Sequence, residues 1–304
     1  MGDCRRTHLS GVAARDVADE LETHAKSLGQ RVLYFGAGGR LEKLRGATHA
    51  RLHIGAQPVW NPQKWNAIVE SKASLRAQLH RARNKNVSVV ECHPDAVPVK
   101  QLRSVLDEWL SFRGLPPLAF LVTPDLFGNL ADRRIFVAYQ HDEPVAFLVA
   151  TPIPSRAGWL VEEWPRRRNA PNGTTHLLVD AAMRAFALSG AQYATLGLAP
   201  LSVRDGHEGD GEAHWLRLVL AWLRAHGTRF FNFRGLEAFK AGMLPHSWEP
   251  IYAISQGKRF PPLALRAIAG AFSAGSPELL VARGIANAAL REFKGLLSRD
   301  SPEG

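Results

Sequence analysis

Two titratable side chains on one short predicted helix are the first candidates for chemistry. Residues 229–233 are rich in β-forming types, and Gly235 follows them, so the pattern predicts a strand that leads into a short helix. Glu237 and Lys240 are three residues apart on that helix and are expected on one face of it, near the end of a sheet. A carboxylate beside an ammonium group suits acid–base chemistry, and it equally suits a surface ion pair.

A second segment combines carboxylates, arginines and a helix start. The predicted strand 159–163 ends in two glutamates, and three arginines and the turn 171–174 follow it. Backbone N–H groups at such a helix start bind anions, although a plain capping turn beside solvated arginines has the same sequence. The Arg/Gln-x-x-Gly-x-Gly/Ala pattern of coenzyme A-binding loops is absent here. The candidates from this segment are Glu162 for catalysis, and Arg166, Asn172 and Gly173 for substrate binding.

Two further features lie close to these candidates. Residues 196–202 form a predicted strand end that contains Gly197 and Pro200, which is typical of a β-bulge or of strands that separate and open a gap in a sheet. His246 follows the predicted short helix and is a candidate substrate contact. The sequence has no metal-ligand or Ser/His/Asp spacing, and its two cysteines form no disulfide framework, so we expect neither a metal nor a cofactor.

The net charge of +10 is unevenly distributed. Residues 1–120 hold 18 Lys and Arg against 11 Asp and Glu, whereas residues 121–255 hold 13 of each kind. A basic first part predicts a polyanionic partner, either nucleic acid or an anionic membrane surface, unless arginine-rich composition alone spreads the charge. On the long helix predicted over residues 62–85, one basic stripe is the candidate surface for such a polyanion, and it comprises Lys72, Arg76, His80 and Arg83.

The order of predicted elements indicates an α/β fold with a mixed sheet. Residues 121–255 read as β-β-β-α-β-α-β-α-β, the order of a GNAT acyltransferase, and residues 1–120 show a less complete alternation. We therefore expect two GNAT-like halves, 1–120 and 121–255, and a helical tail, 256–304, that either packs on the body or lies on anionic lipid. The predicted strands are 31–35, 50–59, 87–91, 134–140, 145–151, 159–163, 193–198, 229–233 and 250–255. The predicted helices are 12–28, with Val17, Leu21 and Leu28 on its apolar side, 62–85, 97–112, 172–188, 212–226, a short one around Phe239, and 261–297.

Three ordered motifs resemble those of one enzyme family. They are Ala-Pro-Asn-Gly-Thr at 170–174, Leu-Gly-x-Ala-Pro-Leu-Ser at 196–202, and Asn-Phe-x-Gly-Leu-x-x-Phe-Lys at 232–240, which Pro-x-x-Trp-Glu-Pro follows. Over roughly residues 30–255 the chain resembles the catalytic domain of aminoacyl-phosphatidylglycerol synthases, the lysyl- and alanyl-phosphatidylglycerol synthases of multiple peptide resistance. The resemblance implies a tandem GNAT-like fold and transfer of an aminoacyl group from aminoacyl-tRNA to a lipid hydroxyl, without acetyl-CoA or metal.

The resemblance also implies roles for single residues. Glu162 takes the position where the family commonly has Asp, and the family's next basic residue falls at Pro165, with Arg166 one place on. Glu162 and Glu237 would hold the amino-acid ammonium or take the acceptor proton. Lys240 would offset charge on the tetrahedral oxygen or the lipid phosphate.

The expected partners are aminoacyl-tRNA, an anionic lipid or membrane surface, and a separate membrane protein. The sequence has no run of the roughly 18–20 apolar residues that span a membrane, so we expect a cytoplasmic protein that acts at the inner face of the membrane. Two alternatives stay open: a GNAT-like N-acyltransferase that acts on a small amine or peptide, and a non-catalytic module that binds tRNA or lipid.

Overall fold

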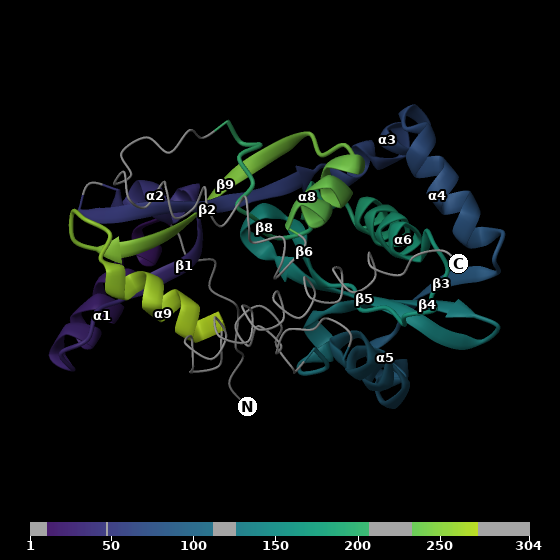
Figure 1. Cartoon of the computed structure of the whole chain (residues 1–304), viewed down its shortest axis with the longest axis horizontal. Coiled ribbons are helices and arrows are strands. Elements are labelled where there is room, and N and C mark those ends of the chain that lie inside the picture. Colours follow the sequence, from purple (N-terminus) through teal and green to yellow (C-terminus); the bar gives the residue numbers. More distant parts are fainter. Residues whose placement is uncertain (1–10, 47, 112–125, 207–232, 273–304) are drawn as a thin grey trace, which may run out of the picture.

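A single mixed β-sheet forms the centre of the molecule. The computed structural model describes residues 11–46, 48–111, 126–206 and 233–272. The nine-stranded sheet has the order β1-β9-β2-β7-β6-β5-β4-β3, and β8 also pairs with β2 (Figure 1). All neighbouring strands are antiparallel except β6 and β7, which are parallel. The strands are β1 (Leu33–Gly38), β2 (His49–Trp60), β3 (Val87–Cys92), β4 (Arg134–Gln140), β5 (Glu143–Ile153), β6 (Gly158–Glu163), β7 (Tyr193–Thr195), β8 (Ala199–Pro200) and β9 (Ser247–Gln256).

Several helices lie close to the predicted positions, but α2 (Gly39–Arg45) was not predicted. The single helix expected over residues 62–85 is wrong, because the backbone of Lys72 is extended (φ −105°, ψ 95°) and divides it into α3 and α4. The predicted helix 212–226 and residues 229–232 of the predicted strand 229–233 lie outside the described residues, and Phe233 begins α8 instead of ending a strand. The α-helices are α1 (Gly11–Ser27), α2 (Gly39–Arg45), α3 (Trp65–Ser71), α4 (Ala73–Arg83), α5 (Val99–Ser111), α6 (Thr174–Leu188), α8 (Phe233–Gly242) and α9 (Pro262–Phe272).

Helices cover both faces of the central strands. In β4 and β5, alternate side chains such as Phe136 and Leu148 pack with α6 in one cluster, while Ile135 and Phe147 pack with α5 in another. Strands buried on both faces read as continuous apolar runs, as residues 145–150 do. This packing fixes the central strands rigidly beneath the helices.

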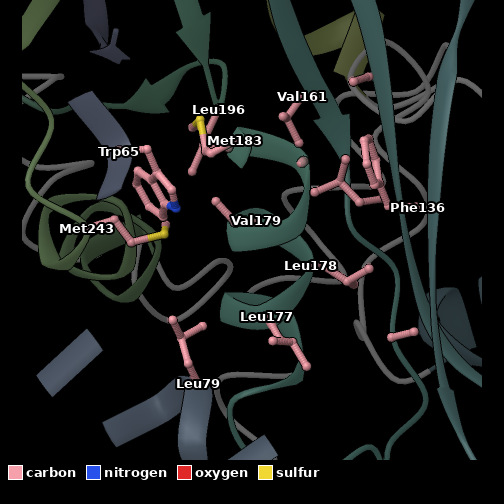
Figure 2. Close-up of a cluster of buried hydrophobic side chains, with 14 of the residues drawn as sticks. Trp65, Leu79, Phe136, Val161, Leu177, Leu178, Val179, Met183, Leu196 and Met243 are labelled. Atoms are coloured by element: carbon pink, nitrogen blue, oxygen red, sulfur yellow. The ribbon is translucent and has the colours of Figure 1, made fainter. Parts of the chain in front are cut away.

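Helix α6 is the hub of the larger cluster. Figure 2 shows its side chains pointing to several neighbours: Met183 lies beside Leu196, while Trp65 and Met243 lie together on another side. Met243 comes just after α8, and Trp65 begins α3. The hydrophobic core therefore ties α8 to the body of the molecule through α6.

One sheet contains strands from both of the predicted halves. Strand β3, from the first part of the chain, pairs with β4 from the second part, and β9 inserts between β1 and β2. The predicted boundary at residue 120 itself lies outside the described residues, so the division stays a prediction. Helix α9 packs on the β2–β9 region through Ala264, Leu265 and Ile268, and the rest of the predicted tail helix, 273–297, is outside the described residues.

Gly173 permits the close approach of α6 to α4. Its φ is +94°, and a Cβ added to it would stand 2.2 Å from the carbonyl oxygen of Gln78 on α4. The structure thus gives this glycine a packing function at the start of α6. Asn172, beside it, is exposed.

We expect Gly173→Ala to destabilise the protein by more than about 3 kcal/mol, because backbone strain and a backbone clash add together. Urea unfolding measures the difference. Gly190→Ala is the matched control: its φ is +77° with nothing within 4 Å of the added Cβ, so it carries only the left-handed penalty of about 1–2 kcal/mol. Equal losses for the two variants would contradict the packing function of Gly173.

Candidate functional site

The parallel strands β6 and β7 separate at one end. Strand β7 stops at Thr195, and the chain returns to β2 only at Ala199 in β8. The strand predicted to reach Leu198 is therefore shorter, and residues 196–198 leave the hydrogen-bond ladder between two stretches that both pair with β2. The predicted separation of strands is confirmed, and it turns backbone carbonyls away from the sheet.

The side chain of Lys240 occupies this separation. Its Nζ donates to the carbonyl oxygens of Gly197 (3.0 Å) and Leu198 (2.8 Å), and the residue is only 2% exposed. The Nζ atom also lies 5.7 Å from the ring centroid of Trp164. Helix α8, which carries Lys240, lies beside β8 and α6 (Figure 1). The amine of Lys240 thus donates to two backbone carbonyls, lies near one aromatic ring and is hardly accessible to water.

The pKa of Lys240 reflects this burial. Desolvation lowers it from 10.5 to about 7, and the negative charge of Glu163 opposes that change. A neutral amine has two N–H donors and one lone pair, so the two backbone carbonyls satisfy both donors of the neutral form. Near neutral pH this lysine therefore exists in both protonation states.

A β-bulge in β6 sets the register position of Glu163. Val161 pairs with Ala150, so an unbroken ladder would place Glu162 opposite Val149, but the register shifts and Glu163 takes that place. The charge that acts on Lys240 accordingly belongs to Glu163. The side chain of Glu162 lies outside the described part of the structure.

The same bulge places Arg166 in register one position later than expected. Arg166 pairs with Ala146, where an unbroken ladder would place Pro165. Sequence reasoning missed Glu163 because it counted without a bulge. The signal was the apparent displacement of the family's basic residue from Pro165 to Arg166, since taking Glu163 as the acid removes that displacement.

Glu237 does not share the surroundings of Lys240. Its Oε1 accepts from Nε of Arg204 at 2.5 Å, and its side chain is 25% exposed. Arg204 in turn lies over the ring of Trp248, 5.8 Å from its centroid. The helix therefore directs Lys240 into the sheet and Glu237 toward a more exposed ion pair.

The remaining predicted substrate contacts lie at the surface. Arg166 and His246 are exposed, and the backbone N–H of His246 donates to the carbonyl of Val59. The neighbouring Arg167 is held by an ion pair with Glu108 on α5, 2.7 Å long. Neither exposed side chain is brought to Lys240 by a recorded contact.

The side chains of two residues of the predicted basic stripe bind other helices, and those of the other two make no such contact in the described ranges. Arg76 donates to the carbonyls of Val69 and Glu70 at the end of α3, and Arg83 pairs with buried Asp180 on α6 at 3.3 Å. Asp180 also accepts from Trp65 and Arg184, so it joins α3, α4 and α6. His80 is exposed, and Lys72 lies at the α3–α4 break.

A second buried ionisable pair lies near the strand separation and was not predicted. Nε2 of His53 lies 2.8 Å from Oδ2 of Asp205, and their side chains are 7% and 1% exposed. The ring of Tyr252 packs edge-on against His53. This pair fixes the segment after β8 against β2.

In the part of the chain that the structure describes, no group of three or more His, Cys, Asp and Glu residues is arranged to hold a metal ion. Among the helices of the described ranges, none combines the length and apolar character that crossing a bilayer needs.

We expect the effect of Lys240 on the free energy of unfolding to depend on pH. Between about pH 7 and 10.5 the unfolded chain binds a proton on this lysine and the folded chain does not, so stability rises with pH in that window. Relative to Lys240→Met, the unfolding free energy of the wild type should increase by up to about 1.4 kcal/mol per pH unit. Urea unfolding at several pH values measures this. The exposed control Lys85→Met should give no such trend. If the difference in unfolding free energy between the wild type and Lys240→Met does not change with pH, the lowered pKa of Lys240 is contradicted.

The chain matches one known protein family. The model of the family "Phosphatidylglycerol lysyltransferase, C-terminal" matches residues 10–255. A comparison with curated protein sequences gives no match.

Solved structures share the fold. One described as the C-terminal domain of a lysylphosphatidylglycerol synthetase from Agrobacterium fabrum is 21% identical, with a TM-score of 0.68, over 86% of this chain and 79% of that one. L-PGS from Bacillus licheniformis is 18% identical, with a TM-score of 0.67, over 85% and 78%. The fold is thus the mixed α/β, GNAT-like acyltransferase fold that the sequence predicted, and the chain belongs to the family of phosphatidylglycerol lysyltransferase C-terminal domains.

Proposed function

We propose that this protein transfers an aminoacyl group from aminoacyl-tRNA to a glycerol hydroxyl of phosphatidylglycerol. The observation that carries the proposal is the buried amine of Lys240, set in the separation of β6 and β7 and facing the charge of Glu163, in a chain of this family. Family membership supports the transfer and the lipid acceptor. The tRNA donor rests on the resemblance of the three sequence motifs and on the basic first part of the chain.

The reaction exchanges one ester for another and needs no cofactor. The acceptor hydroxyl attacks the aminoacyl carbonyl, its proton leaves to a base, and the bond to the ribose oxygen breaks as that oxygen regains a proton. Glu163, which is half-buried, is the general base that takes the proton and returns it to the ribose. Lys240 acts as a positioning residue behind it, because its own donors are held by backbone carbonyls.

Other predicted residues keep roles around this pair. Glu237, through its second carboxylate oxygen, would hold the ammonium group of the amino acid, and Arg166 would contact a substrate phosphate at the surface. Lys72, His80 and Arg83 would contact tRNA phosphates with salt-dependent affinity. Arg76 belongs to the fold, since it binds the end of α3.

The proposed setting is the inner face of the membrane. The protein would meet anionic lipid there as a peripheral protein and receive charged tRNA from the cytoplasm. A separate membrane protein is a proposed partner that presents the lipid or moves the product. A transfer assay with different charged tRNAs determines which amino acid the protein transfers.

A transfer assay tests the function and its base together. Charged tRNAs with labelled amino acids are incubated with phosphatidylglycerol vesicles, and labelled lipid is separated by chromatography. We expect label in the lipid without acetyl-CoA, and a loss of about 10²–10⁴-fold in Glu163→Gln, as for removal of a general base. The adjacent variant Glu162→Gln is the control and should stay within a few-fold of the wild type.

Three results would contradict the proposal. Absence of labelled lipid with every charged tRNA, or label that requires acetyl-CoA, would reject the function. If Glu162→Gln loses more transfer activity than Glu163→Gln, Glu163 is not the general base.

The transfer rate should rise as pH increases through about 7. Loss of the Lys240 proton, whose pKa is about 7, removes a cation from beside Glu163 and makes that carboxylate a stronger base. The measurement is kcat against pH for the wild type and Lys240→Met. The step near pH 7 should vanish in the variant, and a step that persists would assign it to another group.

A further inference from the structure

Arg204 lies at the tip of a short segment that is fixed at both ends. Ser202 is fully buried, and the side chain of Asp205 is 1% exposed and bonded to His53 at 2.8 Å. Between these anchors, Val203 is 45% exposed and the Arg204 side chain 47% exposed. The backbone therefore presents two neighbouring side chains to solvent from a fixed position.

Two contacts orient the guanidinium of Arg204. Its Nε donates to Glu237 on α8, and its Cζ lies 5.8 Å from the ring centroid of Trp248 on β9. Within the ranges that the structure describes, its two terminal nitrogens make no hydrogen bond. An oriented guanidinium with donors to spare is suited to bidentate binding of a phosphate group.

Arg204 also lies close to the proposed reaction centre. Glu237, its partner, precedes Lys240 by three residues on α8, which is about one helical turn. The backbone of the same loop, at Gly197 and Leu198, holds the amine of Lys240. One segment thus connects the phosphate-binding candidate to the buried amine.

The surroundings of Arg204 favour a lipid over a nucleic acid. Val203 is 45% exposed beside it, and the ring of Trp248 lies under it. An exposed aliphatic side chain and an indole next to a cation suit the boundary between lipid headgroups and acyl chains. Solvated phosphates of an RNA backbone gain nothing from the aliphatic groups.

We propose that Arg204 binds the phosphodiester of the acceptor lipid at the membrane surface and thereby sets which hydroxyl reaches the reaction centre. This inference rests on the proposed function. In phosphatidylglycerol the acceptor hydroxyls lie a few bonds from the phosphate, so a phosphate bound by Arg204 holds them beside α8, the helix that carries Lys240. Arg204 then acts on the affinity for the acceptor more than on the chemical step.

The test is equilibrium binding of the whole protein, without tRNA, to vesicles of phosphatidylglycerol and of phosphatidylcholine. We expect Arg204→Gln to weaken binding to phosphatidylglycerol vesicles about tenfold, the value of one charge-assisted contact, and Arg204→Lys to weaken it less. The matched control is Arg31→Gln, which removes an exposed arginine just before β1 and should leave binding unchanged. In the transfer assay, Arg204→Gln should raise KM for lipid more than it lowers kcat.

Glu237→Gln separates lipid binding from a purely structural ion pair. If Arg204 binds lipid phosphate, removing the charge of Glu237 frees the guanidinium, and vesicle binding is retained or strengthened. If Arg204 serves only to hold Glu237, both variants change binding in the same direction, which would overturn the proposal.

Two other results would also overturn the inference. If Arg204→Gln and the wild type bind phosphatidylglycerol vesicles with equal affinity, Arg204 does not bind the lipid. Displacement of the vesicles by millimolar inorganic phosphate would identify a site for free phosphate instead of lipid. The vesicle measurement needs no turnover, so a wild type that binds lipid through Arg204 yet transfers nothing would reject the proposed function alone.

Discussion

The hydrogen bonds from Lys240 to the carbonyls of Gly197 and Leu198 hold the centre of this molecule together. Parallel strands β6 and β7 stop pairing at Thr195, and the carbonyls beyond that point would be left in a poorly hydrated interior. A buried polar group without a partner is costly, and the amine satisfies two such groups at once. The same arrangement desolvates the amine, so the feature that completes the fold also sets its protonation.

Much of the fold could be predicted because local patterns and tertiary structure agree. The apolar runs 134–140 and 145–151 with a turn signal at 141–144 between them predict the hairpin of β4 and β5, and Gly190 predicts the end of α6. On the predicted helix 62–85 the apolar stripe is Ile68, Leu75, Leu79 and Ala82, and all are buried except Ile68, which is partly buried. The break at Lys72 was missed, since nothing in the residue types there disfavours a continuous helix.

The site was harder to predict because it depends on register and on packing between distant segments. One extra residue in β6 puts Glu163 at the register position where an unbroken ladder would put Glu162, and side-chain alternation alone cannot reveal it. The spacing of Glu237 and Lys240 placed them on one helical face, but tertiary contacts with Arg204 and with the strand separation send them to different surroundings. The predicted apolar side of helix 12–28 is wrong: Ala18 and Ala25 of α1 are buried, while Val17 and Leu21 of α1 and Leu28 just after it are exposed.

The position of β9 has a consequence for how the protein is made. Strand β9 forms the bridge between β1 and β2, so these two early strands have no direct ladder with each other and stay incomplete until residue 256 has left the ribosome. Contacts over some 200 residues of chain are slow to form, and exposed strand edges meanwhile invite aggregation. Nascent chains of this protein should therefore depend on chaperones that shield the edges of β1 and β2 during synthesis.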